Sequence, residues 1–399
     1  MTEFLNSSLS HPANPGFQPS IPTPHRLGDA LDSFLLKKAL HASTPRLTRP
    51  VGVALARDYI EQKGARRLGW RALRKEVAYF LSGQRELQRQ RIEPSWKRGI
   101  FLHFGAEQIG DSLMDLAPRS LLHQAGPRMD LFSSPSITEL FQGDPWFGKV
   151  TCKPDDLICS QYDFAIVLSN RHSSLQPKSR YFKNLPWVSI HESFSGPDFD
   201  RAGYATQRLC DLLGTHLTRQ DFEYHASQKM TASAATLEPP AASGADPFIA
   251  ICVGGVDARR VYLKWDAVID GLIARGHRNF KLIGSTNGVA AAKRLENQFR
   301  GAANLENHAG HTGIHQAQKL LAKATAVACC DGGLMHVAAT TLTPLVALFG
   351  NTIQPAWRLR GANLARAMSS TSSNVNDIDP QDVVRRLSFL TSTPSAFHA

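Results

Sequence analysis

The chain lacks the features that mark exported or membrane-spanning proteins. Its six cysteines include no Cys-x-x-Cys pair, and several lie within apolar runs, where a free cysteine behaves as a small hydrophobic residue. No apolar stretch approaches the roughly 18 residues that cross a bilayer, and no basic segment with an apolar core opens the chain. These absences predict a cytoplasmic protein with reduced thiols.

Patterns for metals and nucleic acids are also missing. No Asp-x-Asp motif follows an expected strand, and no His/Cys cluster has the spacing of metal ligands. Aromatic residues make up 8% of the chain and are not interleaved with basic ones, as stacking platforms for bases require. We therefore expect neither a metal site nor a nucleic-acid partner.

The composition suits two folded domains with extensions. Hydrophobic residues make up 42% of the 399 residues and charged residues 20%, which is typical of globular proteins. Short apolar runs alternate with helical patterns in both halves, and this predicts two Rossmann-like α/β halves. The expected strands are 98–104, 129–132, 149–152, 164–168 and 187–190, then 248–253, 278–283, 326–330 and 345–349. The main expected helices are 111–125, 137–141 and 201–213, then 289–299, 314–324, 334–341 and 380–390.

The domain boundaries follow from changes in composition. A Ser- and Pro-rich stretch opens the chain, and an Ala-, Ser- and Pro-rich stretch without periodicity separates the halves. We expect a disordered tail (1–25), a basic helical extension (26–97), a first half (98–214), a linker (215–247), a second half (248–370), and a C-terminal helix that crosses back to the first half, with a tail (371–399).

The most informative stretch is 326–352. It reads as a buried strand, a turn at Asp331-Gly332-Gly333, a helix from Leu334, and a second buried strand. Free N–H groups and the positive end of a helix dipole meet at such a turn, which favours a phosphate, and His336 supplies a further possible donor. A single Gly-Gly turn is also common in α/β domains with no ligand.

The whole string is more specific than the turn. Asp-x-Gly-x-x-His-x-x-Ala-Ala followed by Pro-x-x-Ala-Leu-Phe-Gly-x-Thr resembles the donor-site signature of glycosyltransferase family 9, the bacterial lipopolysaccharide heptosyltransferases. The matching residues are Asp331, Gly333, His336, Ala338, Ala339, Pro344, Ala347, Leu348, Phe349, Gly350 and Thr352. The chain departs from the family at Gly332, where a Ser or Thr is usual, and at 286–288, where a ribose-binding glutamate is usual.

This resemblance implies a GT-B architecture, with two Rossmann-like domains facing a cleft. It implies inverting, metal-independent transfer of a heptose or related sugar from a nucleotide diphosphate sugar, with ADP-heptose expected, to a lipopolysaccharide-core or other glycan acceptor. The first half would bind the acceptor and the second the donor, and no cofactor besides the nucleotide sugar is implied. The implied donor-binding residues are Asp331, Gly332, Gly333, Leu334, His336, Arg260, Lys264 and Thr352. A protein acceptor and a non-catalytic nucleotide-sugar-binding scaffold stay open as alternatives.

Two positions in the resemblance admit more than one residue. The family has a basic residue, normally lysine, that faces the donor phosphates; Arg260, Arg259 or Lys264 would take that place here. The catalytic base implied by the Ile109-Gly110-Asp111 triplet is Asp111, although a helix cap is an alternative role for it. Asp115, one helical turn later, is the other candidate base.

The extension carries most of the net charge. Residues 1–99 contain 17 Lys or Arg and 8 Asp or Glu, a net charge of +9 out of +11 for the whole chain. A basic amphipathic helix is expected in this region, with apolar residues at helical spacing. Its basic residues are Lys63, Arg66, Arg67, Arg71, Arg74 and Lys75, and its apolar residues are Trp70, Leu73, Val77 and Phe80. Segment 57–98 could dock on an anionic glycolipid or on the inner face of the bacterial inner membrane, or pack as a layer on the core.

Overall fold

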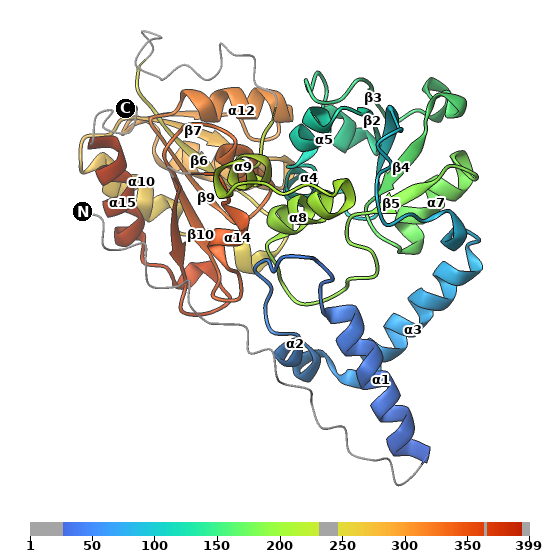
Figure 1. Ribbon diagram of the computed structural model, residues 1–399. Coiled ribbons are helices and arrows are strands. Elements are labelled where there is room, and N and C mark those ends of the chain that lie inside the picture. The colour runs from blue at the N-terminus through green and yellow to red at the C-terminus, as the bar shows by residue number, and fades with distance from the viewer. Residues whose placement is uncertain (1–26, 231–245, 363–364, 393–399) are drawn as a thin grey trace.

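The computed structural model describes residues 27–230, 246–362 and 365–392. Two α/β halves lie side by side, and the helical extension projects from the first half (Figure 1). The predicted tail at 1–25 and residues 231–245 of the predicted linker lie outside the described residues.

The first half contains a parallel five-stranded sheet in the order β3-β2-β1-β4-β5. Its strands are β1 (Arg98–His103), β2 (Arg128–Ser133), β3 (Val150–Thr151), β4 (Phe164–Val167) and β5 (Trp187–Ser189). The helices are α4 (Ile109–Asp115), α5 (Arg119–Ala125), α6 (Pro135–Leu140), α7 (His172–Tyr181), α8 (Arg201–Leu213) and α9 (Arg219–Ala226). The helix expected over 111–125 is divided between α4 and α5 just before and after Pro118, because proline lacks an N–H and disfavours helix geometry in the residue before it.

The second half contains a parallel six-stranded sheet in the order β11-β10-β9-β6-β7-β8. Its strands are β6 (Ile249–Cys252), β7 (Asn279–Ile283), β8 (Asn304–Asn307), β9 (Ala326–Cys330), β10 (Leu345–Phe349) and β11 (Ala365–Ser369). The helices are α10 (Trp265–Ile273), α11 (Val289–Gln298), α12 (Ile314–Lys323), α13 (Gly333–Ala339), α14 (Pro355–Arg358) and α15 (Pro380–Ser392).

Both sheets have the Rossmann strand order, which confirms the predicted fold class. In each, the chain first builds three strands outward in one direction and then returns to the far side of the first strand. The reversal lies between β1 and β4 in the first sheet and between β6 and β9 in the second. Ligands of open α/β sheets bind beyond the carboxyl ends of the strands at such a reversal. The loops after these four strands are therefore where a site is expected.

Two sequence predictions about the connections are wrong. The segment at 215–247, expected to have no regular structure, contains α9, which begins at Thr218 with a side-chain cap and packs against α8. The last helix, expected to cross back to the first half, packs instead on α10, β9 and β10 of its own half. Its buried residues Val383, Val384 and Leu387 complete the core beside that sheet.

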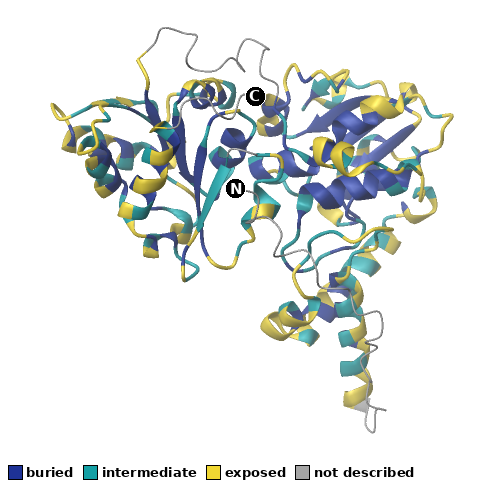
Figure 2. Ribbon diagram, turned by 60° about the vertical axis from the view of Figure 1, so that its left-hand side comes forward, coloured by how far each residue is buried: buried dark blue, intermediate teal, exposed yellow. Residues whose placement is uncertain are grey.

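The extension is formed by α1 (Leu27–Ser43), α2 (Ala56–Lys63) and α3 (Ala65–Leu81). The chains of α1 and α3 approach closely at Gly69, where an added Cβ would lie 2.3 Å from the Leu35 carbonyl oxygen. The buried face of α3 is formed by Leu68, Gly69 and Ala72, and the stripe expected to be its apolar face stays largely exposed (Figure 2). No helix in the described part of the chain is long and apolar enough to cross a membrane.

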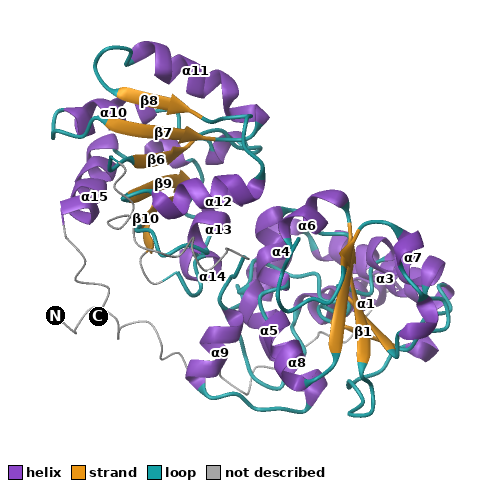
Figure 3. Cartoon of the chain, turned by 90° about the horizontal axis from the view of Figure 1, so that it is seen from above, coloured by secondary structure: helices purple, strands orange, loops and turns teal. Residues whose placement is uncertain are grey.

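The halves meet through helices at the carboxyl ends of their strands. Helix α13 packs on α4, α12 on α6, and α14 on α8. Seen from above, α13 and α4 lie between the two sheets (Figure 3). Buried apolar residues of both halves, including Leu113 of α4 and Met335 of α13, belong to one continuous cluster. This contact brings the two strand reversals toward each other.

Candidate active site

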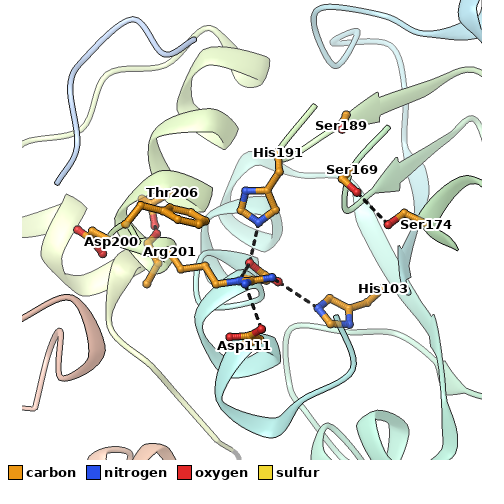
Figure 4. Close-up of polar contacts among 12 residues, drawn as sticks. His103, Asp111, Ser169, Ser174, Ser189, His191, Asp200, Arg201 and Thr206 are labelled. Carbon is orange, nitrogen blue, oxygen red and sulfur yellow. Dashed lines mark hydrogen bonds and ion pairs between the residues drawn. The ribbon is translucent and has the colours of Figure 1, made fainter. Parts of the chain in front are cut away.

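The predicted base lies at the strand reversal of the first sheet. Asp111 is the third residue of α4, which begins after Gln108, so its predicted alternative role as the helix cap is wrong. One carboxylate oxygen lies 3.1 Å from Nη1 of Arg201, at the start of α8 (Figure 4). The Asp111 side chain is 32% exposed, so the carboxylate can meet a ligand while the arginine orients it.

The other candidate base is in a different environment. The Asp115 side chain is fully buried and receives hydrogen bonds from Arg201 Nε at 2.6 Å and from His191 Nε2 at 2.8 Å. His103 Nε2 lies 3.4 Å from its second oxygen. Burial by itself would raise the pKa of Asp115, but Arg201, His191 and His103 hold that pKa well below its ordinary value. Asp115 is therefore a fixed buried anion, and it lacks the access that a base needs.

Arg201 joins the two carboxylates. Burial alone would lower the pKa of Arg201, but Asp115 and Asp111 raise it, so the guanidinium stays charged. Burial lowers the pKa of His191 despite the nearby Asp115, so that ring is neutral at neutral pH and donates from Nε2. The network fixes Arg201, and Arg201 fixes Asp111 (Figure 4).

The predicted donor residues gather at the other strand reversal, after β6 and β9. Asp331 is buried, and Arg260 Nη1 lies 3.0 Å from its Oδ2 without hydrogen-bond geometry. Burial raises the pKa of Asp331, and Arg260 and Arg358 oppose that rise. Arg259 turns away and pairs with Asp257 at 2.9 Å, which leaves Arg260 as the arginine that faces the motif. Lys264 is half-buried and directly precedes α10.

The glycine turn differs from the expectation. Gly332 has extended backbone with φ 168°, so it is not the tight left-handed turn that glycine alone allows. A Cβ on Gly332 would meet only the Cys330 carbonyl at 3.9 Å, whereas one on Gly333 would touch Ile109 of α4. Gly332 thus faces open space and Gly333 faces the other half. Leu334 packs on the shared core, and Thr352 lies exposed in the turn after β10.

His336 is not free to meet a phosphate. Its ring is buried, its Nδ1 donates to Gln228 Oε1 at 2.7 Å, and a Cβ on Gly110 would lie 2.4 Å from its Cδ2. Burial, followed by Arg358 and Arg260, lowers the pKa of His336 to about 3, so the ring is neutral. The ring joins the donor helix to the turn that carries Asp111, and this contact replaces the predicted one.

Sequence reasoning missed several residues that link the halves. Arg358 of α14 pairs with Asp198, and Arg360 pairs with Asp200 and Glu223. Both arginines follow β10, but nothing in the local pattern shows their partners, which lie 137 to 160 positions earlier in the chain. In the described ranges, no group of three or more His, Cys, Asp or Glu side chains is arranged to hold a metal ion.

With this geometry established, comparison with known proteins is informative. Residues 199–386 match the model of glycosyltransferase family 9 (heptosyltransferase). The chain carries a glycosyltransferase family 9 domain. The family 9 match includes α8 and the second half as far as the middle of α15, and it begins after Asp111.

One curated relative of the family 9 domain is lipooligosaccharide heptosyltransferase 2 of Haemophilus influenzae. It is 34% identical over 116 residues, which cover 27% of this chain and 33% of that protein. The chain thus matches only a third of that relative's length.

Solved structures extend the likeness of the fold. Escherichia coli ADP-heptose lipopolysaccharide heptosyltransferase II has a TM-score of 0.55 at 20% identity, covering 74% of this chain and 98% of that one. A family 9 glycosyltransferase from Veillonella parvula gives 0.59 at 12% identity, covering 76% and 99%. At these identities the match shows the fold, and together with the two parallel sheets it confirms the GT-B architecture.

Proposed function

We propose that this chain is an inverting glycosyltransferase that moves a heptose from a nucleotide diphosphate sugar, ADP-heptose, to a lipopolysaccharide-core or other glycan acceptor. The observation that carries the proposal is the meeting of two paired groups at the contact between the halves. Asp111 with Arg201 lies on one side, and Asp331 with Arg260 lies on the other. The family 9 domain and its lipopolysaccharide-type relatives support this chemistry.

Asp111 acts in this proposal as the general base. It accepts the proton of an acceptor hydroxyl while that oxygen forms a bond to the anomeric carbon and the bond to the diphosphate oxygen breaks. A carboxylate within hydrogen-bond reach of the hydroxyl typically accelerates such a step by about 10²–10⁴-fold. Arg201 is a positioning residue, because it holds the base through a 3.1 Å ion pair and is itself fixed by Asp115.

The second half stabilises the leaving nucleoside diphosphate. Arg260, 42% exposed, is positioned to meet phosphate charge, and Lys264 follows in the same connection. Backbone N–H groups of Gly332, Gly333 and Leu334 add donors. His336 supports them from behind through its contacts with Gln228 and Gly110.

The extension brings this enzyme to an anionic membrane surface. Trp70, Val77, Phe80 and Leu81 are exposed on α3, and the exposed Arg67 and Arg74 accompany them. Amphipathic helices with aromatic and basic residues bind the headgroup region, and each basic residue contributes about 1 kcal/mol near anionic lipid. Vesicles with phosphatidylserine should therefore retain the chain, less so at high salt, and Trp70→Ser with Phe80→Ser should weaken retention.

The decisive experiment offers ADP-heptose, UDP-sugars and GDP-sugars separately to the full chain with a pool of purified acceptors. Intact-mass analysis should show an added heptose with the ADP donor alone, and Asp111→Asn should remove the product. Nucleotide binding without transfer to any glycan or protein acceptor would favour the scaffold alternative, and transfer to protein would move the acceptor to that class.

A further inference from the structure

Three basic side chains act on one another electrostatically where α3 of the extension packs on α7 beside the first sheet. Arg171 follows β4 and directly precedes α7, and Arg71 and Lys75 lie one turn apart on α3. Lys75 Nζ donates to Ser195 Oγ at 2.8 Å, in the loop after β5. Burial lowers the pKa of Arg171, and Arg71 and Arg201 lower it further. Burial, Arg171 and Arg71 lower the pKa of Lys75 to about 7. We call Arg71, Lys75 and Arg171 the cation cluster.

The cation cluster has no balancing carboxylate of its own. Among the described residues, none of its three members forms an ion pair within 4 Å, although neighbouring cations such as Lys38 and Arg208 do. Asp115 acts on Arg171 from a distance, but Arg201 and His191 already hold it. Lys75 and Arg171 are half-buried and Arg71 is exposed beside them, so their mutual repulsion costs free energy that an anionic ligand would offset.

Buried polar atoms without partners point to the same place. Nε of Arg171 and Oδ1 of Asn170 are buried and form no hydrogen bond with any described residue. Most buried polar atoms in folded proteins do have a partner, so two adjacent unpaired atoms mark a position where a polar ligand binds. Nε of Arg171 and the lysine ammonium are donors, which suits an anion, whereas Oδ1 of Asn170 is an acceptor and suits a hydroxyl of the same ligand.

The cation cluster is also next to the proposed base. Strands β1 and β4 are neighbours at the strand reversal; Asp111 lies in the first turn of α4, which follows β1, and Arg171 directly precedes α7, which follows β4. Arg201 pairs with Asp111 and acts on Arg171. An anion held by Arg171 is therefore at the same edge of the sheet as the hydroxyl that Asp111 would deprotonate.

We propose that Arg71, Lys75 and Arg171 bind a phosphate group carried by the sugar acceptor, so that the N-terminal extension completes the acceptor site. This inference rests on the proposed function. Phosphate is favoured over carboxylate because two guanidinium forks and an ammonium match a dianion with several acceptor oxygens.

A pocket beside the cation cluster leaves room for the rest of the acceptor. It has a volume of about 540 Å³, within the usual range of ligand sites, and lies between α3 and α7. Lining residues include Ala78, Tyr79, Ser82, Asn170, His172 and Arg180. Arg71, Lys75, Ala78 and Ser82 share one face of α3 by helical spacing, so the cluster and the pocket follow each other along that face.

The first test measures inorganic phosphate binding to the full chain by calorimetry, with acetate at equal ionic strength for comparison. Phosphate should bind and acetate should not, and Arg171→Gln and Lys75→Gln should each weaken phosphate binding by about tenfold or more. Arg67→Gln and Arg74→Gln, exposed on the same helix, should leave it unchanged. Phosphate can also bind at the donor site, and the loss of binding in Arg260→Gln measures that contribution. No phosphate binding, or equal losses in Arg67→Gln and Arg74→Gln, would overturn the inference.

The second test measures acceptor KM with and without phosphatase treatment of the acceptor. Arg171→Gln should raise the KM for the phosphorylated acceptor by about tenfold, with kcat and ADP affinity unchanged, and it should have no effect on the treated acceptor. Thermal unfolding should show equal or higher stability in this variant, because one of the mutually repelling charges is gone. Transfer with an unchanged KM would refute the inference and keep the proposed function. If the chain transfers no sugar but its phosphate binding still depends on the cation cluster, the phosphate site stands and the proposed function is refuted.

Discussion

Two groups of cations lie along the same sheet edge and differ in how their charge is balanced. Arg201 is 16% exposed and touches two carboxylates, whereas Arg71, Lys75 and Arg171 form no ion pair among the described residues. A balanced cation, one paired with carboxylates, is held in one position and can hold a neighbouring side chain in turn. An unbalanced cation, one without such a pair, gains more free energy when an anionic ligand binds. Arg201 therefore stabilises the structure of the site, whereas Arg71, Lys75 and Arg171 are available to bind a ligand.

The largest effect is expected when the proposed base, Asp111, is replaced. Asp111→Asn should lower kcat by about 10²–10⁴-fold, because a neutral amide cannot accept the hydroxyl proton. ADP affinity, set by the other half, should change little when measured by calorimetry. Near-normal turnover would show that Asp111 serves only the α4 structure.

The next largest effect should be on stability. Asp115→Asn leaves the buried Arg201 with only Asp111, and breaking a buried pair costs about 3–5 kcal/mol of unfolding free energy. Urea denaturation measures the loss, and Asp155→Asn on the surface should change stability by about 0.5 kcal/mol or less. The pKa of folded Asp115 lies below the ordinary 3.8, so the difference is full at neutral pH and shrinks as pH falls below that value. Equal stability of the two variants would mean that the network contributes nothing.

The donor side should respond more modestly. Arg260 pairs with Asp331 but is partly exposed, so Arg260→Gln should weaken ADP binding by about tenfold. Arg259→Gln, whose side chain faces Asp257, should bind ADP normally. The reverse result would assign the phosphate contact to Arg259.

The last prediction is a pH dependence and concerns the unbalanced group. The pKa of folded Lys75 is lowered to about 7 from 10.5, so the unfolded chain binds a proton that the folded chain does not over that interval. Wild-type stability should therefore fall relative to Lys75→Met as pH is lowered from about 10.5 to 7. The prediction would be contradicted if the melting temperatures of wild type and Lys75→Met differed by the same amount at every pH in this range.

Local patterns predicted much of the fold. Strands β9 and β10 and helix α8 occupy the residues expected from apolar runs and periodicity. Strands β8 and β11 were missed because they are edge strands with half-exposed, polar sequences, Asn-Leu-Glu-Asn in the case of β8. Of the two roles left open for α3, the structure exposes much of the apolar stripe and packs the helix on α1 through Gly69, where the absence of a side chain gives no hydrophobic signal.

The candidate site was only partly predictable. Asp111, Asp331 and Arg260 came from motifs, but Arg201 did not, because an ion pair across 90 positions leaves no local pattern. The orientation of His336 depends on Gly110 and Gln228, both more than 100 positions away. Tertiary contacts determine the orientation and the partners of such side chains, and the local pattern of a single sequence does not predict those contacts.

The stacking of His336 on Gly110 has a consequence for fidelity. The same helical turn carries Asp111, so a motion that separates the halves would also move this carboxylate away from the second half. If Asp111 is the base that we propose, water entering an open molecule would meet the sugar donor without that carboxylate beside it. The contact would then limit hydrolysis of the donor.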